Sequence, residues 1–208
     1  MTTMRPQVFE CPNCGSRFQA EVLTSTNNFG GQRTDFKQVA SGMDPLPAMI
    51  HSCQRCGFTG NRSEFRGTVQ PEVAEKIKTD IFPHVLDERL DAHTRWEFAA
   101  RIAEWRGQSV WSVADLYLHA AWCADGDQGK QSYYQRKAAD YFEQAIEEEK
   151  EQPLQILYLI GELYRRAGDQ AVAENWFDKT IAAAGEDSGN KDIKELALRQ
   201  KTNPTNMI

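Results

Sequence analysis

The sequence predicts a mostly α-helical protein with a small β-containing module at its N-terminus. Two Cys-x-x-Cys-Gly segments lie between positions 11 and 57, in a part of the chain rich in turn-forming residues. From Pro71 onwards, apolar residues recur with a helical period between Gly and Pro breaks. A chain of 208 residues has room for one or two domains. We therefore expect two, residues 1–70 and residues 71–208.

The two cysteine segments are Cys11-Pro12-Asn13-Cys14-Gly15 and Cys53-Gln54-Arg55-Cys56-Gly57, and 38 residues lie between Cys14 and Cys53. Each turn presents two thiolates to one point, and two turns supply the four-sulfur tetrahedral shell that Zn²⁺ prefers. The glycine after each turn can take positive φ, which lets backbone N–H groups point toward the sulfurs. The sequence therefore predicts a zinc-ribbon-like, metal-binding module with one structural zinc ion per chain, bound by Cys11, Cys14, Cys53 and Cys56.

Other uses of these cysteines are less consistent with the sequence. Four thiolates also bind iron, and ligand type alone does not separate the two metals. Redox dithiols of the thioredoxin kind need a βαβ context that is absent here, and five cysteines without a secretory signal disfavour disulfides. His51 is not needed as a ligand beside four thiolates. Cys123, at the end of an apolar helix, is expected to be a buried small hydrophobe rather than a nucleophile.

Residues 7–70 should form strands and turns around the metal. Arg17–Leu23 alternates polar and apolar side chains, which predicts a strand leaving the first cysteine turn. Ser25–Gln32 is rich in turn formers, and Ala48–Ser52 should enter the second turn as a strand. So few apolar residues could hardly fold alone, whereas a structural zinc ion contributes about 10–16 kcal/mol.

The rest of the chain predicts a series of helices. Pro71 suits the first turn of the first one, and Pro83 interrupts the pattern after it. The expected helices are Pro71–Asp80, Leu86–Arg106, Val110–Cys123, Ser132–Lys150, Leu154–Ala167, Ala171–Ala184 and Asp192–Gln200.

Residues 154–184 fit the pattern of a tetratricopeptide-like α-helical hairpin. Gly161 and Ala173 fall where the two helices approach most closely, and Tyr164 and Phe177 fill the space beside them. A second hairpin is similar only if an inserted loop occupies Asp125–Gln131, and a generic antiparallel helix bundle is the alternative. In this second hairpin, the residues that match the second-helix pattern are Ala138, Phe142 and Ala145.

Tetratricopeptide repeats bind peptides along the inner face of their first helices. When the register of the repeat is applied to this sequence, the groove-lining positions are Trp111, Asp115, Leu118, His119, Tyr158, Glu162, Arg165 and Arg166. In the alternative interpretation, Glu162 and the two arginines simply form ion pairs three and four residues apart on an exposed helix face.

Charge and motifs limit the function classes. The net charge is −6, and residues 1–70 contain seven Lys or Arg against five Asp or Glu, so neither part has a basic nucleic-acid footprint. No apolar run is long enough for a bilayer, and no signal sequence precedes the cysteines, which favours a cytoplasmic protein without a membrane partner. Walker, nucleophile-elbow, dinucleotide and H-E-x-x-H motifs are all missing. The sequence therefore predicts that the protein is not an enzyme.

Two functions remain. The preferred one is a non-enzymatic adaptor, in which a structural zinc head is joined to a helical-repeat body that binds a protein or peptide. The alternative is a zinc ribbon that contacts nucleic acid while the helices position it, although the modest charge weakens this case. A hydrolase or transferase between the two parts has no catalytic constellation. The candidate phosphate contacts are Arg17, Arg33, Lys37, Arg55, Arg62 and Arg66.

Several blocks of this chain together resemble a bacterial family, domain-of-unknown-function family 2225, over nearly its whole length. The blocks are Cys11–Cys14 with Phe18, Asp35-Phe36, Gly42-x-Asp44-Pro45, Cys53–Phe58, Tyr117–Trp122 and Leu159–Gly168. The resemblance implies a zinc-ribbon-like head with tetratricopeptide-like helices and brings no established activity. Gln54 stands where the family usually has Pro, and Met43-Asp44 replaces a Glu-Asn pair, but neither change affects a metal ligand.

Overall fold

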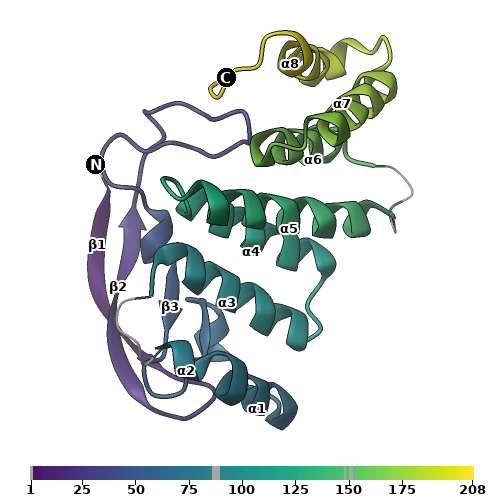
Figure 1. Ribbon diagram of the computed structural model, residues 1–208. Helices are drawn as coiled ribbons and strands as arrows, with labels where there is room; N and C mark the ends of the chain where they lie inside the picture. Colours follow the sequence, from purple (N-terminus) through teal and green to yellow (C-terminus); the bar gives the residue numbers. More distant parts are fainter. Residues whose placement is uncertain (1, 86–89, 148, 150–151) are drawn as a thin grey trace.

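The computed structural model describes residues 2–85, 90–147, 149 and 152–208. Two small antiparallel sheets lie at the N-terminal end, and a stack of helices follows them (Figure 1). The mostly α fold class with a small β module is therefore confirmed. Among the described residues, no helix combines the length and the hydropathy needed to cross a bilayer.

Each small sheet is a hairpin that contains one cysteine turn. β1 (Thr3–Glu10) pairs with β2 (Arg17–Ser25), and β3 (Ile50–Ser52) pairs with β4 (Thr59–Asn61). The strands predicted around both turns are thus confirmed, although the second begins at Ile50 because a 3₁₀ turn, η1 (Leu46–Ala48), precedes it. A second 3₁₀ turn, η2 (Glu64–Arg66), follows β4.

β1 was not predicted from the sequence, because Pro6 within it argues against a strand. Pro6 is tolerated since β1 has a strand partner on one side only, β2. The pairing places Phe9 opposite Phe18, with ring centroids 5.6 Å apart, so this hairpin brings its own apolar contribution to the core.

The helical part follows the predicted order closely. The bounds are α1 (Pro71–Asp80), α2 (Phe82–Val85), α3 (Ala92–Trp105), α4 (Val110–Cys123), α5 (Gln128–Glu147), α6 (Leu154–Ala167), α7 (Gln170–Ala184), a 3₁₀ turn η3 (Ser188–Asn190) and α8 (Lys191–Thr202). Helices α1, α4 and α6 have the predicted bounds, because local signals set their ends. Pro71 lies in the first turn of α1, and Gly168 ends α6 with φ of 93°. The helix predicted at Leu86–Arg106 starts, and the helix predicted at Ser132–Lys150 ends, at a residue that lies outside the described residues.

The loop predicted at Asp125–Gln131 is wrong in its second half. Helix α5 already begins at Gln128, four residues before the predicted start. The Asp127 carboxylate accepts a hydrogen bond from the Lys130 N–H at 3.1 Å, as in a helix N-cap, and this bond favours an early start. Part of the segment predicted as an inserted loop therefore forms the first helical turn of α5.

Two observations describe how the parts pack. One hydrophobic cluster joins Phe9 of β1 and Phe58, the residue before β4, to Ile77 of α1 and Ile102 of α3, so apolar contacts continue across position 70. The division of the chain at that position stays a prediction. A Cβ added to Gly161 would lie 2.9 Å from the Phe177 ring, which confirms the close approach of α6 and α7. The assignment of these helices as tetratricopeptide repeats remains a prediction.

The long connection between β2 and η1 leaves the β module and reaches the helices near the C-terminal end of the chain (Figure 1). Gly30 and Val39 close its tip with a hydrogen bond of 2.9 Å from the Gly30 N–H to the Val39 carbonyl. The last residues pair with this tip, since the Thr34 N–H donates to the Asn206 carbonyl at 3.1 Å and the Ile208 N–H donates to the Gln32 carbonyl at 2.9 Å.

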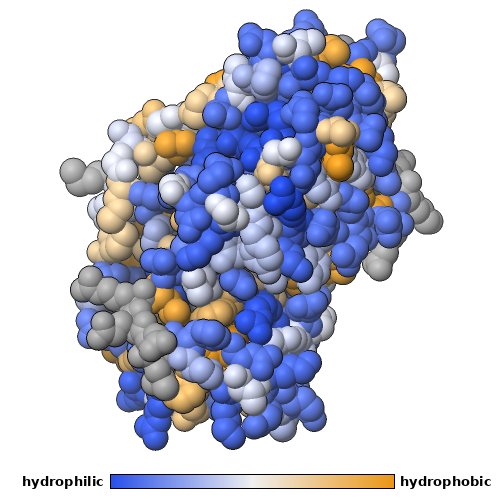
Figure 2. Space-filling view, in the orientation of Figure 1, coloured by the Kyte–Doolittle hydropathy of each residue, from blue (hydrophilic) through white to orange (hydrophobic). Residues whose placement is uncertain are grey.

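The face of the molecule seen in Figure 2 is largely polar. On the coloured part of the face in Figure 2, hydrophilic residues dominate and hydrophobic residues occur in small groups. Such a face is typical of a solvated surface, whereas large protein interfaces expose extended apolar patches.

Candidate metal centre

The two cysteine turns have the same backbone geometry. In the first, the Cys11 N–H donates to the Ser16 carbonyl at 2.9 Å, and the Gly15 N–H donates to the Cys11 carbonyl at 2.8 Å. In the second, the corresponding bonds from Cys53 and Gly57 are both 2.8 Å long. Both glycines have positive φ, 69° and 84°. The Cys-x-x-Cys-Gly spacing thus produces two matching turns, as the sequence predicts.

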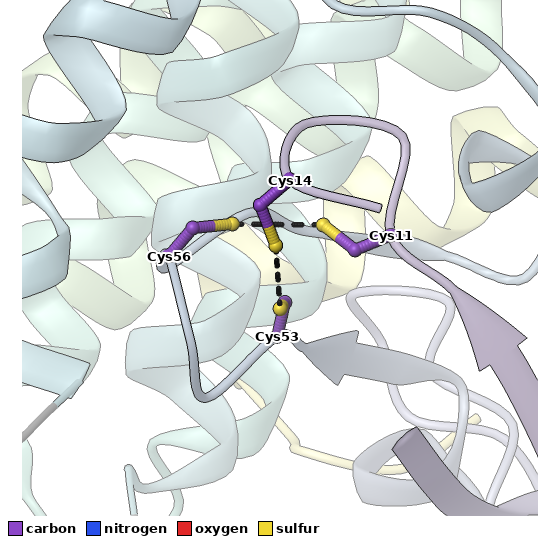
Figure 3. Close-up of side chains that lie close together, drawn as sticks. All are labelled: Cys11, Cys14, Cys53 and Cys56. Atoms are coloured by element: carbon purple, nitrogen blue, oxygen red, sulfur yellow. Dashed lines mark hydrogen bonds between the residues drawn. The ribbon is translucent and has the colours of Figure 1, made fainter. Parts of the chain in front are cut away.

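The four sulfur atoms converge on one point (Figure 3). All four ligand atoms lie within 4.8 Å of one another; the Cys11 and Cys56 sulfurs are 3.5 Å apart, and those of Cys14 and Cys53 are 3.7 Å apart. Because a Zn–S bond is about 2.3 Å long, the sulfurs of a tetrahedral shell are about 3.8 Å apart. The donor set and its spacing therefore fit a four-coordinate thiolate metal site.

The surroundings of the sulfurs favour a thiolate. The Ser16 hydroxyl lies 3.0 Å from the Cys14 sulfur and 3.2 Å from the Cys53 sulfur, so it can donate to a charged ligand. Hydrogen bonds with Cys11 and Cys56 lower the pKa of Cys53, while those with Cys53 and Cys56, together with burial, raise the pKa of Cys11. A divalent cation bound by four thiolates would displace the protons of the cluster.

Two other candidate residues lie apart from this cluster. The His51 ring packs against Phe9, with centroids 4.7 Å apart, and among the described residues the cysteines alone form the metal-ligand group. The fifth cysteine, Cys123, is partly buried at the end of α4, and burial raises its pKa to about 12. The expectation that Cys123 packs as a small hydrophobe and is not a nucleophile stays a prediction.

The two glycines of the turns differ in what surrounds them, and this gives a matched pair of variants. A Cβ on Gly15 meets nothing within 4 Å, whereas one on Gly57 would lie 3.0 Å from the Phe82 Cα of α2. Gly15→Ala should cost about 1 kcal/mol, from positive φ alone, and Gly57→Ala about 2–4 kcal/mol, because backbone contact adds to it. Denaturant unfolding of the two zinc-loaded variants measures the difference. Equal losses would contradict the close packing of this turn on α2.

His51 predicts a pH dependence of stability. Burial lowers its pKa to about 4, whereas an unfolded histidine titrates near 6.5. Below pH 6.5 the unfolded chain gains a proton that the folded chain excludes, so stability is lost as pH falls toward 4. His51→Phe should reduce the loss of unfolding free energy between pH 7 and pH 5 by about 2 kcal/mol relative to wild type. An unchanged pH slope in denaturant titrations would count against a buried neutral His51.

The eight residues predicted to line the helical groove do not form one open surface. Asp115 is exposed and His119 partly buried on α4, but Leu118 of the same helix is only 4 % exposed. On α6, Tyr158 and Glu162 are fully buried. Arg165 and Arg166 are partly buried beside Glu162, and Trp111 of α4 is partly buried. The α6 half of the predicted groove is therefore inside the protein.

The chain's own β2–η1 connection covers that half. The Thr34 hydroxyl donates to the Glu162 carboxylate at 2.6 Å, and the Arg166 guanidinium donates to the Thr34 hydroxyl at 2.7 Å. The ring of Phe36, a residue with positive φ, lies 5.4 Å from that of Tyr158. A segment of the N-terminal part thus occupies the α6 face, where we expected a partner.

Glu162 is the centre of the ion pairs at this junction. Its carboxylate lies 2.8 Å from the Arg165 guanidinium and 2.6 Å from that of Arg166, and it is fully buried. Asp35, 1 % exposed, adds a second buried carboxylate 3.8 Å from Arg166 and 2.8 Å from Arg33. The expected pairs three and four residues apart do form, but in the interior and not on an exposed face.

The six basic residues considered for nucleic acid lie in different surroundings. Arg33 pairs with Asp35 and with Asp125, and the Lys37 ammonium lies 2.8 Å from Asp44. These two cations therefore serve contacts within the chain. Exposed side chains are found at Arg17, Arg55, Arg62 and Arg66.

Comparison with protein families gives a match over nearly the whole sequence. The family model described as "Uncharacterized protein conserved in bacteria (DUF2225)" matches residues 6–203, which include all four cysteines of the cluster and every helix from α1 to α8. Comparisons with curated proteins and with solved structures found no match. Since the family model spans nearly the whole sequence, the chain belongs to the bacterial DUF2225 family.

Proposed function

We propose that this protein is a non-enzymatic scaffold whose N-terminal module is held by one structural Zn²⁺ ion on Cys11, Cys14, Cys53 and Cys56. The observation that supports this most strongly is the convergence of four sulfurs within 4.8 Å from two matching turns. A shell of four thiolates leaves no position for water or substrate, so it suits a structural role better than zinc catalysis.

The position of the cluster explains what the ion would do. Cys11 follows β1 and Cys53 follows β3, so one ion would join the two hairpins, which lie in separate sheets. Both cysteines are 1 % exposed and belong to the hydrophobic cluster that includes Ile77 of α1. Zinc binding would thus fix the orientation of the whole module on the helices.

We propose further that the helical body binds a protein or peptide partner in the cytoplasm. The α6 face supports this idea indirectly, since it already binds an extended segment, the chain's own Thr34–Phe36. Because that face is filled, the part of the predicted groove left for a partner is on α4, at Trp111, Asp115 and His119.

The test of the structural role is hydrogen exchange of the full chain before and after metal removal by a chelator under reducing conditions. We expect amides of residues 7–25 and 50–61 to lose protection, and added Zn²⁺ but not Mg²⁺ to restore it, because thiolates are poor ligands for Mg²⁺. Unchanged protection in metal-free protein would contradict a structural role for the ion.

The test of the binding role is a photo-crosslinking residue placed at Asp115 in the full-length protein inside a bacterial host. The matched control carries it at Leu198 of α8, which is 44 % exposed and far along the chain from α4. A defined adduct that forms at position 115 and not at position 198 supports a partner on α4, whereas identical adducts at both positions would contradict it.

A further inference from the structure

A pocket of about 690 Å³ lies between the N-terminal module and helices α3 and α4. Its volume is within the range of about 300–1,000 Å³ typical of small-molecule sites. β2, η1, β3 and the turn after β4 form one side, and α3 and α4 form the other. Apolar side chains dominate the lining, and they include Val22, Leu23, Met49, Trp96 and Leu116.

Two arginines give the pocket a polar end. Arg62 and Arg66 both line it, and both are exposed. Among the described residues neither lies within ion-pair distance of a carboxylate, and the acid between them in the sequence, Glu64, pairs with Arg106, which directly follows α3. Two guanidinium groups thus lie at an apolar pocket with no ion-pair partner among the described residues.

The turn that carries these arginines is fixed in place. The Asn61 side-chain oxygen accepts hydrogen bonds from the Ser63 N–H at 2.9 Å and from the Ser63 hydroxyl at 2.6 Å. The Glu64–Arg106 ion pair ties the same turn to α3. The arginine backbones are therefore preorganised, which lowers the entropic cost of binding a ligand between them.

The remaining charges leave the lining positive. Its single carboxylate belongs to Asp115, which lies 3.3 Å from the Nδ1 atom of His119. A locally cationic pocket is unusual in a chain of net charge −6, and by complementarity it would select an anion.

We propose that this pocket binds a small amphiphilic anion, with its apolar body against Met49, Trp96 and Leu116 and its carboxylate, sulfonate or phosphate group on Arg62 and Arg66. Arginine suits such groups because its planar fork can donate two hydrogen bonds to one of them. The pocket is separate from the cysteine cluster, so the proposal does not depend on which metal the cysteines hold. It does require the module to be folded.

The test uses metal-loaded full-length protein and two fluorescent probes with the same ring system. One is the anion 8-anilinonaphthalene-1-sulfonate, and the other is the uncharged N-phenyl-1-naphthylamine. We expect saturable binding of one anionic probe per chain. The double variant Arg62→Gln, Arg66→Gln should lower the affinity for the anionic probe about tenfold and leave the affinity for the neutral probe unchanged. Only the anionic probe contacts the guanidinium groups.

Two further variants separate the pocket from other surfaces. Arg5→Gln with Arg17→Gln removes two exposed positive charges from the same module outside the pocket, and it should change anionic binding less than about twofold. Met49→Asp puts a carboxylate into the apolar lining at a side chain that is already 39 % exposed, and it should weaken both probes.

Three results would overturn the proposal. They are the absence of saturable binding, equal effects of the two double variants on the anionic probe, and binding that Met49→Asp leaves intact. Circular dichroism and thermal unfolding of each variant exclude loss of fold as the cause of a weaker signal.

Discussion

Cys53→Ser is expected to abolish stoichiometric zinc binding and to unfold the N-terminal module. The Cys53 sulfur lies 3.7 Å from that of Cys14 and 3.2 Å from the Ser16 hydroxyl, so it is central to the cluster. A serine oxygen at this buried position cannot replace a thiolate in a soft four-sulfur shell. Since structural zinc sites contribute about 10–16 kcal/mol to folding, losing most of that exceeds the stability of a typical domain.

Cys123→Ser is the matched control, because Cys123 lies on α4 away from the cluster. We expect the control to keep one zinc ion per chain and to lose about 1 kcal/mol or less. Metal content and far-ultraviolet circular dichroism of the two purified variants measure the contrast. Full metal content in Cys53→Ser would show that the ion binds elsewhere.

Glu162→Gln is expected to lower the free energy of unfolding by about 3–5 kcal/mol. The glutamate is fully buried and compensates the charges of Arg165 and Arg166, which are themselves mostly enclosed. An amide of the same shape keeps the packing but leaves two guanidinium groups undercompensated, and it weakens the bond to Thr34. Denaturant unfolding of the zinc-loaded variant measures the loss.

Glu195→Gln of α8 provides the comparison, because this exposed residue makes a 3.6 Å ion pair with exposed Lys191. Its removal should cost less than about 1 kcal/mol. The double variant Glu162→Gln, Arg165→Gln should be more stable than the sum of the single changes, since it removes one uncompensated charge. Similar small losses of unfolding free energy for Glu162→Gln and Glu195→Gln would refute a buried charged junction.

The cysteine cluster could be predicted from the sequence because the geometry of each cysteine turn is local. A Cys-x-x-Cys-Gly segment folds the same way at both places, and four thiolates have a narrow range of uses. The ends of α1 and α6 were likewise set by nearby Pro and Gly. Strand β1 was missed because the local signal of Pro6 opposed the pairing that its partner strand supplies.

The burial of Glu162 could not be predicted, because it depends on contacts far along the chain. Its sequence pattern with Arg165 and Arg166 is that of an exposed helix face, and the pairs do form. The residue that encloses it, Thr34, is 128 positions away, in a connection whose course no periodicity reveals. The pocket at Arg62 and Arg66 escaped prediction for the same reason, since several separate segments line it.

The most direct test of the central claim is X-ray absorption at the metal edge of the full-length protein purified under reducing conditions. The account predicts zinc with four sulfur neighbours at about 2.3 Å and no nitrogen or oxygen neighbour in the first shell. Protein without bound metal, an iron edge, or a shell containing histidine nitrogen or water oxygen would contradict a closed structural zinc site on Cys11, Cys14, Cys53 and Cys56.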